Sequence, residues 1–371
     1  MLTDDDFAAW FRLLETPGLG RSGVRRLLAA CGSPAAVFRT PAAALRGVVN
    51  ATVAGALQEL TPEFPARLAA AQHWLAGADD RHALTIDHPA WPPLLLQTAD
   101  PPLLLYVQGD LAKLAAPSVA VVGSRNPTPQ GADNARSLAT ALGAQGYVVV
   151  SGLALGIDGA AHEGALSTAV GTVAVVGTGL DQVYPSRHRE LARRITEHGA
   201  MVSEYPPGTP PLPEHFPQRN RIIAGLSLGT LVVEAALRSG SLITARLALE
   251  AGREVFAVPG SIHAAQTRGC HALIRQGAKL VETAQDIVEE LRSGLPLAQA
   301  AQAAQPAPPS PAAQPADPLL DALGHDPVTL DALLARTGWA TASLTARLLE
   351  LELDGAVARL PGGLFQRRAA G

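Results

Sequence analysis

Short apolar runs recur through the middle of this chain, and small residues follow each of them. Residues 119–122 read Val-Ala-Val-Val, 148–150 read Val-Val-Val and 172–176 read Thr-Val-Ala-Val-Val. None of these runs alternates apolar with polar side chains, so each predicts a strand that is buried on both faces. Helical stretches separate the runs. The pattern therefore predicts an α/β fold with a parallel sheet that helices cover on both sides.

The predicted sheet extends over residues 83–292. Its strands are expected at 118–123, 147–151, 171–177, 201–204, 229–233, 254–258 and 278–281. The segment 84–111 is rich in proline and is expected to pack along one edge of the sheet. Ligands of parallel sheets bind at the carboxyl ends of the strands, so the residues that follow each strand are the first candidates for a site.

Three further segments flank the sheet. Residues 1–82 predict helices, the first of them over 4–15, followed by the turn Thr16-Pro17-Gly18-Leu19-Gly20. This turn resembles a helix-hairpin-helix, in which glycine amides meet a DNA phosphate, and it fits an ordinary structural turn as well. Residues 293–317 are rich in Ala, Pro and Gln and predict a linker. Residues 318–371 show the helix and strand order of a winged helix, or of a small helical cap.

Composition excludes several classes of protein. A chain of 371 residues, 47% apolar and 17% charged, predicts a globular protein of two or three domains. The sequence contains no run of 18 apolar residues, so no membrane span is expected. The chain starts with acidic residues, Asp4, Asp5 and Asp6, and lacks the basic region of a secretory signal. Two distant cysteines, Cys31 and Cys270, fit neither a disulfide scaffold nor a metal site. These features predict a cytoplasmic protein.

Charge gives a mixed signal about nucleic acid. The formal net charge is −4, yet the basic residues are 27 arginines and only two lysines. A GC-rich genome explains such a bias. Arginine also suits phosphate, because its planar fork binds two oxygens at once. The positions of the arginines relative to the sheet therefore decide whether a phosphate site is expected.

The first predicted strand is followed by Gly123, Ser124 and Arg125. A dinucleotide fingerprint requires G-x-G-x-x-G at this place, and the sequence lacks it. Glycine instead allows a close approach of the backbone, serine offers a hydroxyl and arginine supplies charge, a combination that suits a phosphate. Arg187 follows the third strand and is expected to reach over the same sheet edge.

A second motif places an aromatic residue beside basic ones. Phe216, Arg219, Asn220 and Arg221 lie just before an apolar stretch that predicts a helix. Arginine with an aromatic ring is the pairing that holds phosphate and base in single-stranded nucleic acid. A salt-bridged loop around a core phenylalanine is the other interpretation of the same residues.

A third motif, Ser239, Gly240 and Ser241, precedes another predicted helix. Free amides, hydroxyls and the positive end of the helix dipole make such a turn a candidate anion site. Glu234 lies shortly before it and is expected to pair with a partner such as an arginine.

Candidates for catalysis are few. The sequence has no G-x-S-x-G or H-E-x-x-H motif, and neither cysteine has an evident base. Asp158 is interpreted as the N-cap of a helix and His162 as a residue on that helix's face. Glu204 and Glu234 are possible acids or bases, but no substrate is indicated. The motifs favour binding of a polyphosphate over chemistry, with no metal and no cofactor expected.

In their order and spacing, these motifs resemble the DNA-processing protein DprA (Smf) family across roughly 84–290. Further runs that carry the resemblance are 151–158, 177–185 and 252–260. The resemblance implies an extended Rossmann-like core, a helical front like a sterile-alpha-motif or helix-hairpin-helix domain, and a winged-helix tail. It also implies a protein that binds and protects single-stranded DNA, loads the RecA recombinase onto it during natural transformation, and is not an enzyme.

Site residues follow from the same resemblance. The implied DNA-binding residues are Gly123, Ser124, Arg125, Arg187, Phe216, Arg219, Asn220, Arg221, Ser239, Gly240 and Ser241. The family also forms homodimers through the last part of this domain, and here Ile274 and Leu280 are the candidate apolar contacts.

The tail departs from the pattern of a DNA reader. Residues 341–354 contain one arginine, Arg347, against Glu350, Glu352 and Asp354. Because phosphate contact needs positive charge, the tail is expected to contact protein or to bind duplex DNA weakly. The only basic part that could face DNA is the wing, with Arg359, Arg367 and Arg368.

Two other functions stay open. Nucleotide phosphoribohydrolases of the lysine-decarboxylase-like Rossmann group also hold a nucleotide phosphate at glycine-rich strand ends, using a P-G-G-x-G-T-x-x-E run. Here Gly229 and Thr230 precede Glu234 without the Pro-Gly-Gly, which argues against hydrolysis. A scaffold without a nucleic-acid role is the third possibility, and it leaves the arginines at the sheet edge unexplained.

Overall fold

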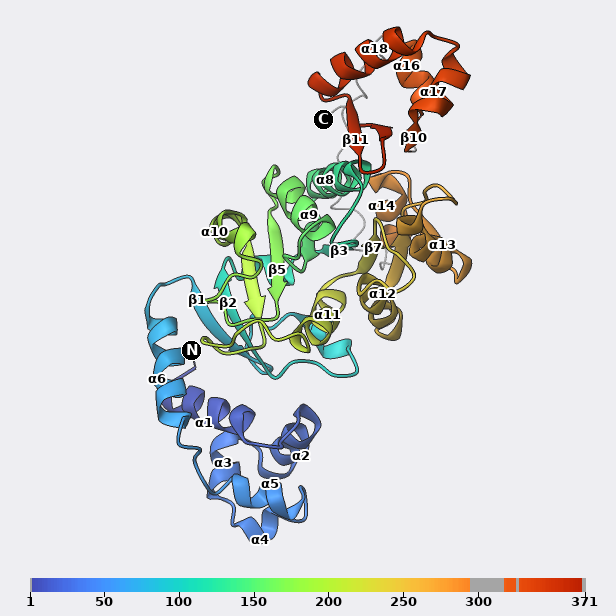
Figure 1. Ribbon diagram of the computed structural model, residues 1–371. Helices are drawn as coiled ribbons and strands as arrows, with labels where there is room; N and C mark the ends of the chain where they lie inside the picture. Colours follow the sequence, from blue (N-terminus) through green and yellow to red (C-terminus); the bar gives the residue numbers. More distant parts are fainter. Residues whose placement is uncertain (1, 294–316, 325–326, 369–371) are drawn as a thin grey trace.

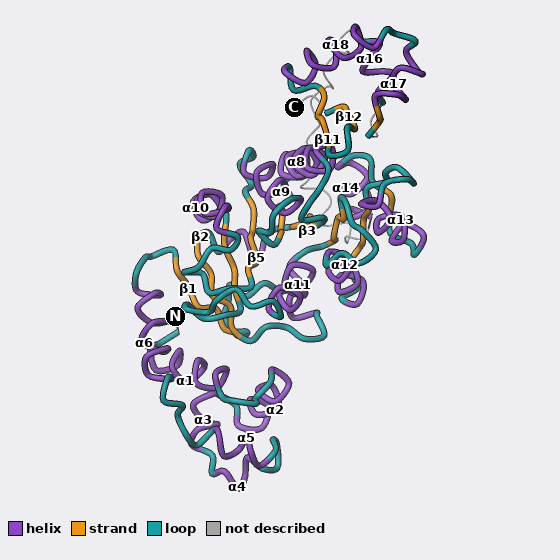
Figure 2. Tube along the Cα trace, viewed as in Figure 1, coloured by secondary structure: helices purple, strands orange, loops and turns teal. Residues whose placement is uncertain are grey.

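The computed structural model describes residues 2–293, 317–324 and 327–368 (Figures 1 and 2). Helices form the N-terminal part: α1 (Asp4–Glu15), α2 (Arg21–Cys31), α3 (Pro34–Arg39), α4 (Ala42–Leu45), α5 (Ala51–Ala56) and α6 (Phe64–Ala76). The predicted first helix is confirmed, and its start is capped by Thr3, which accepts a hydrogen bond from the Asp6 amide at 3.1 Å.

A nine-stranded sheet follows, in the order β1-β2-β6-β5-β4-β3-β7-β8-β9. Its strands are β1 (Arg81–Thr85), β2 (Leu104–Gly109), β3 (Ser118–Val122), β4 (Val148–Ser151), β5 (Thr172–Val176), β6 (Ala200–Ser203), β7 (Gly229–Val232), β8 (Glu254–Ala257) and β9 (Lys279–Leu280). The strands from β3 to β9 pair in parallel. All seven strands predicted from the apolar runs are therefore present.

The segment 84–111 contributes more than the expected packing along an edge. β1 and β2 pair antiparallel, and β2 pairs antiparallel with β6, so this segment extends the sheet itself. A short 3-10 helix, η1 (Pro93–Gln97), lies between them. The prolines of the segment lie outside both strands, where the missing amide hydrogen does not weaken the ladder.

Helices cover both faces of the sheet (Figure 1). One face carries α8 (Pro129–Ala144), α9 (Ile157–Leu166), α10 (Arg189–His198) and α14 (Ala284–Ser293). The other carries α11 (His215–Leu226), α12 (Ser241–Glu250) and α13 (Arg268–Arg275). Val119 and Val121 pack toward the first face and Ala120 and Val122 toward the second, as the alternation of side chains along a strand requires.

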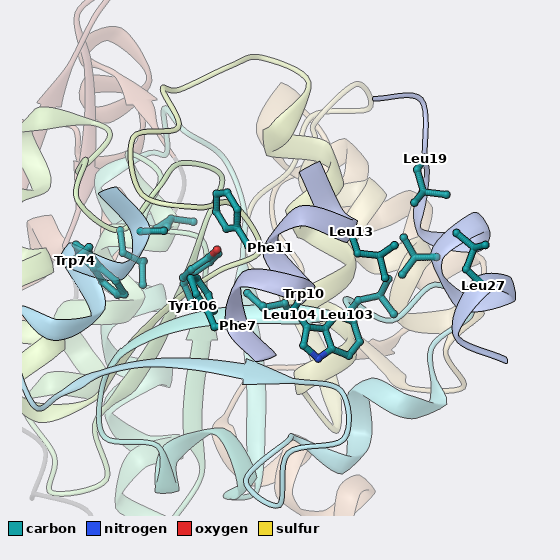
Figure 3. Close-up of a cluster of buried hydrophobic side chains, with 14 of the residues drawn as sticks. Phe7, Trp10, Phe11, Leu13, Leu19, Leu27, Trp74, Leu103, Leu104 and Tyr106 are labelled. Carbon is teal, nitrogen blue, oxygen red and sulfur yellow. The ribbon is translucent and has the colours of Figure 1, made fainter. Parts of the chain in front are cut away.

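The N-terminal helices share a hydrophobic core with the sheet. Phe7 and Trp74 lie edge-on to Tyr106 of β2, with ring centroids 6.4 and 6.3 Å apart (Figure 3). The same cluster continues through Leu103 and Leu104 to Phe11. The front of the chain is therefore packed onto the antiparallel edge of the sheet.

The tail has the predicted winged-helix order. It contains α16 (Pro318–Leu323), β10 (Val328–Thr329), α17 (Leu330–Thr337), α18 (Thr341–Leu353), β11 (Val357–Leu360) and β12 (Leu364–Arg367), with strand order β10-β12-β11. Arg368 connects it to the core by donating to Asp133 of α8, with 3.1 Å between Nε and Oδ2. The linker expected at 293–317 falls almost wholly outside the described residues. No helix within the described ranges is long and apolar enough to cross a membrane.

Candidate functional site

A groove of about 720 Å³ opens at the carboxyl ends of the parallel strands. Most of the predicted site residues line it, and these are Gly123, Ser124, Arg125, Phe216, Arg219, Asn220, Ser239, Gly240 and Ser241. Arg187 and Arg221 are not among its lining residues. Residues from the ends of β3 and β4 and from the starts of α11 and α12 thus converge at the place where parallel sheets bind ligands.

The turn after β3 is tightly held. A Cβ at Gly123 would lie 2.7 Å from Ile157 Cγ1 and 2.9 Å from the Glu234 carbonyl oxygen, so only glycine fits there. The Ser124 carbonyl accepts a hydrogen bond from the Ile157 amide at 3.1 Å, and its hydroxyl accepts one from the Asn126 amide at 3.1 Å. This fixed turn presents Arg125 to the groove.

Arg125 is exposed, and its guanidinium lies 5.7 Å from the centre of the Phe216 ring. Within the described part of the chain it has no carboxylate in ion-pair distance. The Phe216 ring in turn lies 5.4 Å from the Tyr184 ring at an angle of 38°. Two aromatic faces and one exposed positive charge therefore meet at the groove.

Arg219 forms the floor of the groove and is buried. Its Nη1 donates to the carbonyl oxygens of Gly152 and Val175, and its Nη2 lies 4.0 Å from Asp158 Oδ2. Burial lowers the pKa of Arg219 to about 10, although the negative charge of Asp158 acts to raise it. The guanidinium is therefore still protonated at neutral pH. The carbonyl oxygens of Gly152 and Val175, at the ends of two strands, stabilise its charge.

Asp158 departs from its predicted role as an N-cap. Gly156 occupies that position, and Asp158 lies in the first turn of α9. Its carboxylate reaches back to accept from the amides of Gly152 at 3.2 Å and Ala154 at 3.3 Å. Burial raises the pKa of Asp158, while Arg219 and these amides favour the charged form. The residue shapes the turn after β4 and also faces Arg219.

His162 has the structural role that its pattern predicts. Its Nδ1 lies 2.8 Å from the Thr172 hydroxyl, which itself donates to the Val149 carbonyl, so Nδ1 donates and Nε2 accepts from the Leu153 amide at 3.3 Å. Burial lowers the pKa of His162 to about 3. The ring is neutral and holds Leu153, whose φ of 57° is in the left-handed region.

The far wall of the groove is the start of α12. The hydroxyls of Ser239 and Ser241 lie 2.7 Å apart, and Asn220 Nδ2 donates to the Gly240 carbonyl at 3.5 Å. Arg238 is exposed on the same wall, and the sequence prediction missed it. The signal was available, because Arg238 directly precedes the Ser-Gly-Ser turn.

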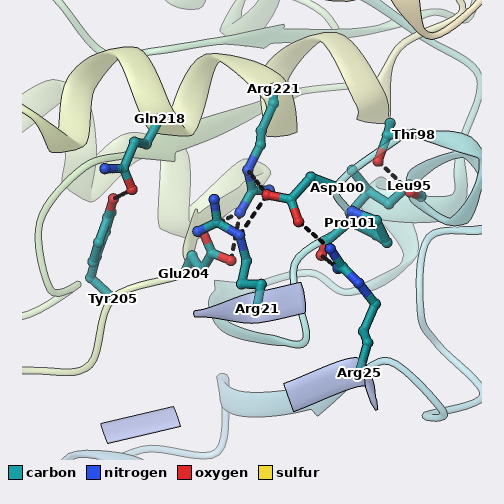
Figure 4. Close-up of polar contacts among 10 residues, drawn as sticks. All are labelled: Arg21, Arg25, Leu95, Thr98, Asp100, Pro101, Glu204, Tyr205, Gln218 and Arg221. Atoms are coloured by element: carbon teal, nitrogen blue, oxygen red, sulfur yellow. Dashed lines mark hydrogen bonds and ion pairs between the residues drawn. The ribbon is translucent and has the colours of Figure 1, made fainter. Parts of the chain in front are cut away.

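The expectation that Arg221 lines the groove beside Arg219 is wrong. Its Nη2 donates to Glu204 Oε1 at 2.6 Å, and its Nε lies 3.7 Å from Asp100 Oδ2 (Figure 4). The motif is not a loop before a helix, because α11 already begins at His215. Two residues along a helix turn by about 200°, so Arg219 and Arg221 point to opposite sides.

Arg187 lies in a 3-10 helix, η2 (Ser186–His188), where it is exposed and is not among the residues that line the groove. From this segment Tyr184 reaches the groove instead. Arg187 thus follows the third parallel strand at the carboxyl edge of the sheet, as expected. It does not line the groove, so the expectation that it reaches over the groove is not met.

Arg221 belongs to a charge cluster that joins the N-terminal helices to the sheet. Arg21 Nε donates to Asp100 Oδ2 at 2.6 Å, and Arg21 Nη1 lies 3.5 Å from Glu204. Arg25 also donates to Asp100, and to the Pro101 carbonyl at 3.0 Å. Two residues of α2 thus hold the N-terminal helices against the central domain (Figure 4).

Glu234 does not pair with an arginine. Its carboxylate accepts from the Thr128 amide at 3.0 Å and from the Thr128 hydroxyl at 2.6 Å. The same hydroxyl caps α8 by accepting from the Gly131 amide at 3.0 Å. Burial raises the pKa of Glu234, and the side chain is not among those that line the groove. Its role here is to tie β7 to the start of α8.

The two candidate dimer contacts differ in exposure. Ile274 of α13 is partly buried and packs against the core of the sheet, whereas Leu280 of β9 is 44% exposed at the sheet's edge. Among the described residues, no group of three or more His, Cys, Asp or Glu side chains could hold a metal ion.

Comparison with known proteins decides the family. Residues 82–292 match the family model for DNA recombination-mediator protein A, and residues 292–363 match the DprA winged helix domain. Protein Smf of Escherichia coli (strain K12) is 45% identical over 294 residues, which cover 78% of this chain and 79% of that protein. The chain belongs to the DprA/Smf family.

Relatives with solved structures share the family fold. The X-ray structure of DprA from Streptococcus pneumoniae superposes with a TM-score of 0.67 at 39% identity, covering 76% of this chain and 97% of that one. DprA from Helicobacter pylori, a protein with a unique single-stranded DNA binding mode, superposes with a TM-score of 0.52 at 32% identity and covers 57% and 96%. The DprA/Smf core is therefore the part of the chain that carries the groove.

Proposed function

We propose that this chain binds single-stranded DNA in the groove at the sheet's carboxyl edge. The observation that carries the proposal is the group formed by Arg125, Phe216 and Tyr184, where a guanidinium without an ion-pair partner among the described residues lies beside two aromatic faces. Phosphate needs such a charge, and an unpaired base stacks on such a ring. Arg219 adds a second, fixed positive charge below them.

The remaining predicted residues fit the same role. Gly123 and Ser124 offer a close backbone approach, and Ser239, Gly240 and Ser241 offer hydroxyls and amides at the start of α12. Exposed Arg187 follows Tyr184, which lines the groove, by three positions and would contact the strand as it leaves. A single-stranded binding mode reported for the Helicobacter pylori relative supports the choice of single strands over duplex.

Fluorescence anisotropy of a labelled single-stranded oligonucleotide and its duplex, over a salt series, tests the proposal. Wild type should bind the single strand more tightly, and Arg125→Ala should weaken it with a salt slope lower by about 1, because one phosphate contact is lost. Arg46→Ala is the control, since Arg46 is exposed on the N-terminal helices. Equal loss in both variants, or in neither, would contradict the proposal.

From DNA binding we infer the wider role of the family for this chain. It would protect single strands in the cytoplasm, including incoming transforming DNA, and load RecA onto them as a homodimer that joins through Ile274 and Leu280. RecA-driven strand exchange on DNA coated with single-strand-binding protein should speed up when the chain is added. Leu280→Glu should reduce this effect and the dimer fraction together.

We infer that the groove does not hydrolyse nucleotides. Glu234, the acid that a phosphoribohydrolase would need, is held by Thr128 outside the groove lining. Release of free base from AMP or CMP that Glu234→Gln abolishes would establish the enzyme instead.

A further inference from the structure

Helix α18 of the winged helix is apolar on two sides. One side carries Leu344, Leu348 and Leu351, which are buried in the small core of the tail. This side accounts for the folding of the tail. The other side needs a separate explanation.

On that other side, Ala342, Ala346, Leu349 and Leu353 are all exposed. Leu349 is 56% and Leu353 80% exposed, and no described residue covers them. The four positions are separated by four, three and four residues, which is the spacing of the seam in a coiled coil. Such a seam is typical of a helix that packs lengthwise against another helix.

Charge along α18 opposes contact with nucleic acid. Its second half and its end carry Glu350, Glu352 and Asp354. The one basic residue, Arg347, donates to Asp317 at 2.6 Å and to Glu350 at 2.6 Å, so its charge is already compensated. A DNA phosphate approaching this face would meet net negative charge.

The first half of α18 has the opposite character. Thr341, Ser343 and Thr345 are exposed there, the first turn holds no acidic residue, and the N-cap, Ala340, offers no side-chain hydrogen bond. Within the described residues, the first turn therefore leaves the positive end of the helix dipole without an acidic side chain or a side-chain cap. The acidic end of a second α18 would complement it.

We propose that α18 pairs antiparallel with α18 of a second copy of this chain. In that register Ala342 faces the partner's Leu353, and Ala346 faces the partner's Leu349. Each large side chain then meets a small one, which fills the seam evenly. The hydroxyl residues of one helix lie beside the acidic residues of the other.

The parallel arrangement of the same two helices fits poorly. It would stack alanine on alanine at one end and leucine on leucine at the other. It would also bring both acidic ends together, where like charges repel. The antiparallel pair is a two-fold contact between identical faces, and it is separate from Leu280 at the sheet's edge.

The pairing is expected to be weak on its own, because two short helices bury less than a standard interface. It gains from any second contact that already holds two chains together, since the tails are then at a high local concentration. Tail pairing between the two chains of one dimer would add a second contact to that dimer. Tail pairing between chains of different dimers would join the dimers into longer assemblies.

Disulfide trapping in the full chain tests the geometry. The background carries Cys31→Ser, and Cys270 is buried. A tagged Ala342→Cys chain is mixed with a Leu353→Cys chain and oxidised. We expect the mixed cross-link to dominate, because in an antiparallel pair two copies of position 342 lie roughly 16 Å apart along the axis. Cross-links within Ala342→Cys alone, or none at all, would overturn the proposal.

Sedimentation of the full chain over a concentration series, with its other contact intact, provides the second readout. Leu349→Glu with Leu353→Glu should raise the dissociation constant at least about tenfold, because both apolar contacts of the seam are lost. Leu60→Glu, at a residue 51% exposed on the N-terminal part, is the matched control and should change nothing. Association equal to the control would refute tail pairing. Loss of duplex DNA affinity with unchanged association would assign the face to DNA instead.

Discussion

Two arginines on one helix, Arg219 and Arg221, occupy opposite kinds of environment. Arg219 points into the sheet, where it meets two backbone carbonyls and a carboxylate at 4.0 Å. Arg221 points away from the groove, where Glu204 accepts from it at 2.6 Å and Asp100 lies at 3.7 Å. The charge of Arg219 is only partly neutralised and is available to attract a ligand's phosphate. The charge of Arg221 is neutralised by two carboxylates, Glu204 and Asp100.

The difference shows how one helix serves two purposes. The side of α11 that faces the groove fixes a positive floor under the proposed DNA path. The opposite side carries the charge cluster that holds the N-terminal helices through Arg21 and Arg25. The sequence motif alone does not distinguish the two, because both residues are arginine.

The largest effect is expected from Arg219→Ala. It leaves Asp158 and two carbonyls buried without their partner, which should lower the free energy of unfolding by about 3–5 kcal/mol. Urea unfolding followed by circular dichroism measures this loss, with Arg46→Ala as the control. A loss no greater than that of the control would mean that the buried cluster does not support the groove.

Arg221→Ala should have a smaller effect, and on stability only. Losing its hydrogen bonds to Glu204 should lower the free energy of unfolding by about 1.5–3 kcal/mol. Single-strand affinity should stay within about twofold, because no phosphate contact is removed. Anisotropy and urea unfolding on the same sample measure both quantities. If Arg221→Ala weakened DNA binding as much as Arg125→Ala, the comparison of the two faces would fail.

Phe216→Ala separates stacking from charge within the groove. Removing one stacking ring should weaken single-strand binding by about 1–3 kcal/mol. The salt slope should not change, because the number of phosphate contacts is the same. Phe216→Tyr keeps the ring and should restore affinity. A change in slope as large as that of Arg125→Ala would show that the ring acts by positioning the arginine.

The smallest effect is a pH dependence of the N-terminal attachment. Burial works to raise the pKa of Asp100, but hydrogen bonds from Arg25 and Arg21 outweigh it and hold the pKa below its ordinary value of 3.8. The charged form is therefore favoured in the folded state. The stability that Asp100 adds is present above pH 3.8 and is lost as the pH falls through its lowered pKa.

Limited proteolysis of the N-terminal helices between pH 3 and pH 6 measures this effect. Cleavage in the wild type should rise at the acid end. Asp100→Asn should be cleaved faster at pH 6 and show a flatter profile. An identical profile in both proteins would exclude Asp100 as the sensitive group.

Much of the sheet could be predicted from the sequence, because strands buried on both faces are encoded as unbroken apolar runs. The two antiparallel strands are less readily predicted. β1 is only partly buried and lacks an unbroken apolar run. β2 has a buried apolar run, but it follows the proline-rich stretch around η1, and the sequence does not show that it pairs antiparallel. Their pairing depends on β6, which is distant in the sequence.

The groove was also largely predictable, since it gathers the residues that follow consecutive parallel strands. The errors arose where orientation decides the role. Arg221 shares a motif with Arg219 but not a direction, and Glu234 found its partner in Thr128, 106 positions away. The sequence does not predict Tyr184 as a site residue, because its contact with Phe216 depends on the fold.

The turn that presents Arg125 is anchored at both ends. Ile157 holds it through the Ser124 carbonyl, and Glu234 holds the segment that follows through Thr128. Such a loop needs little ordering when a strand arrives, so encounter should be fast and similar among variants of the groove. Differences in residence time, measured by stopped-flow chase, should then account for most differences in affinity.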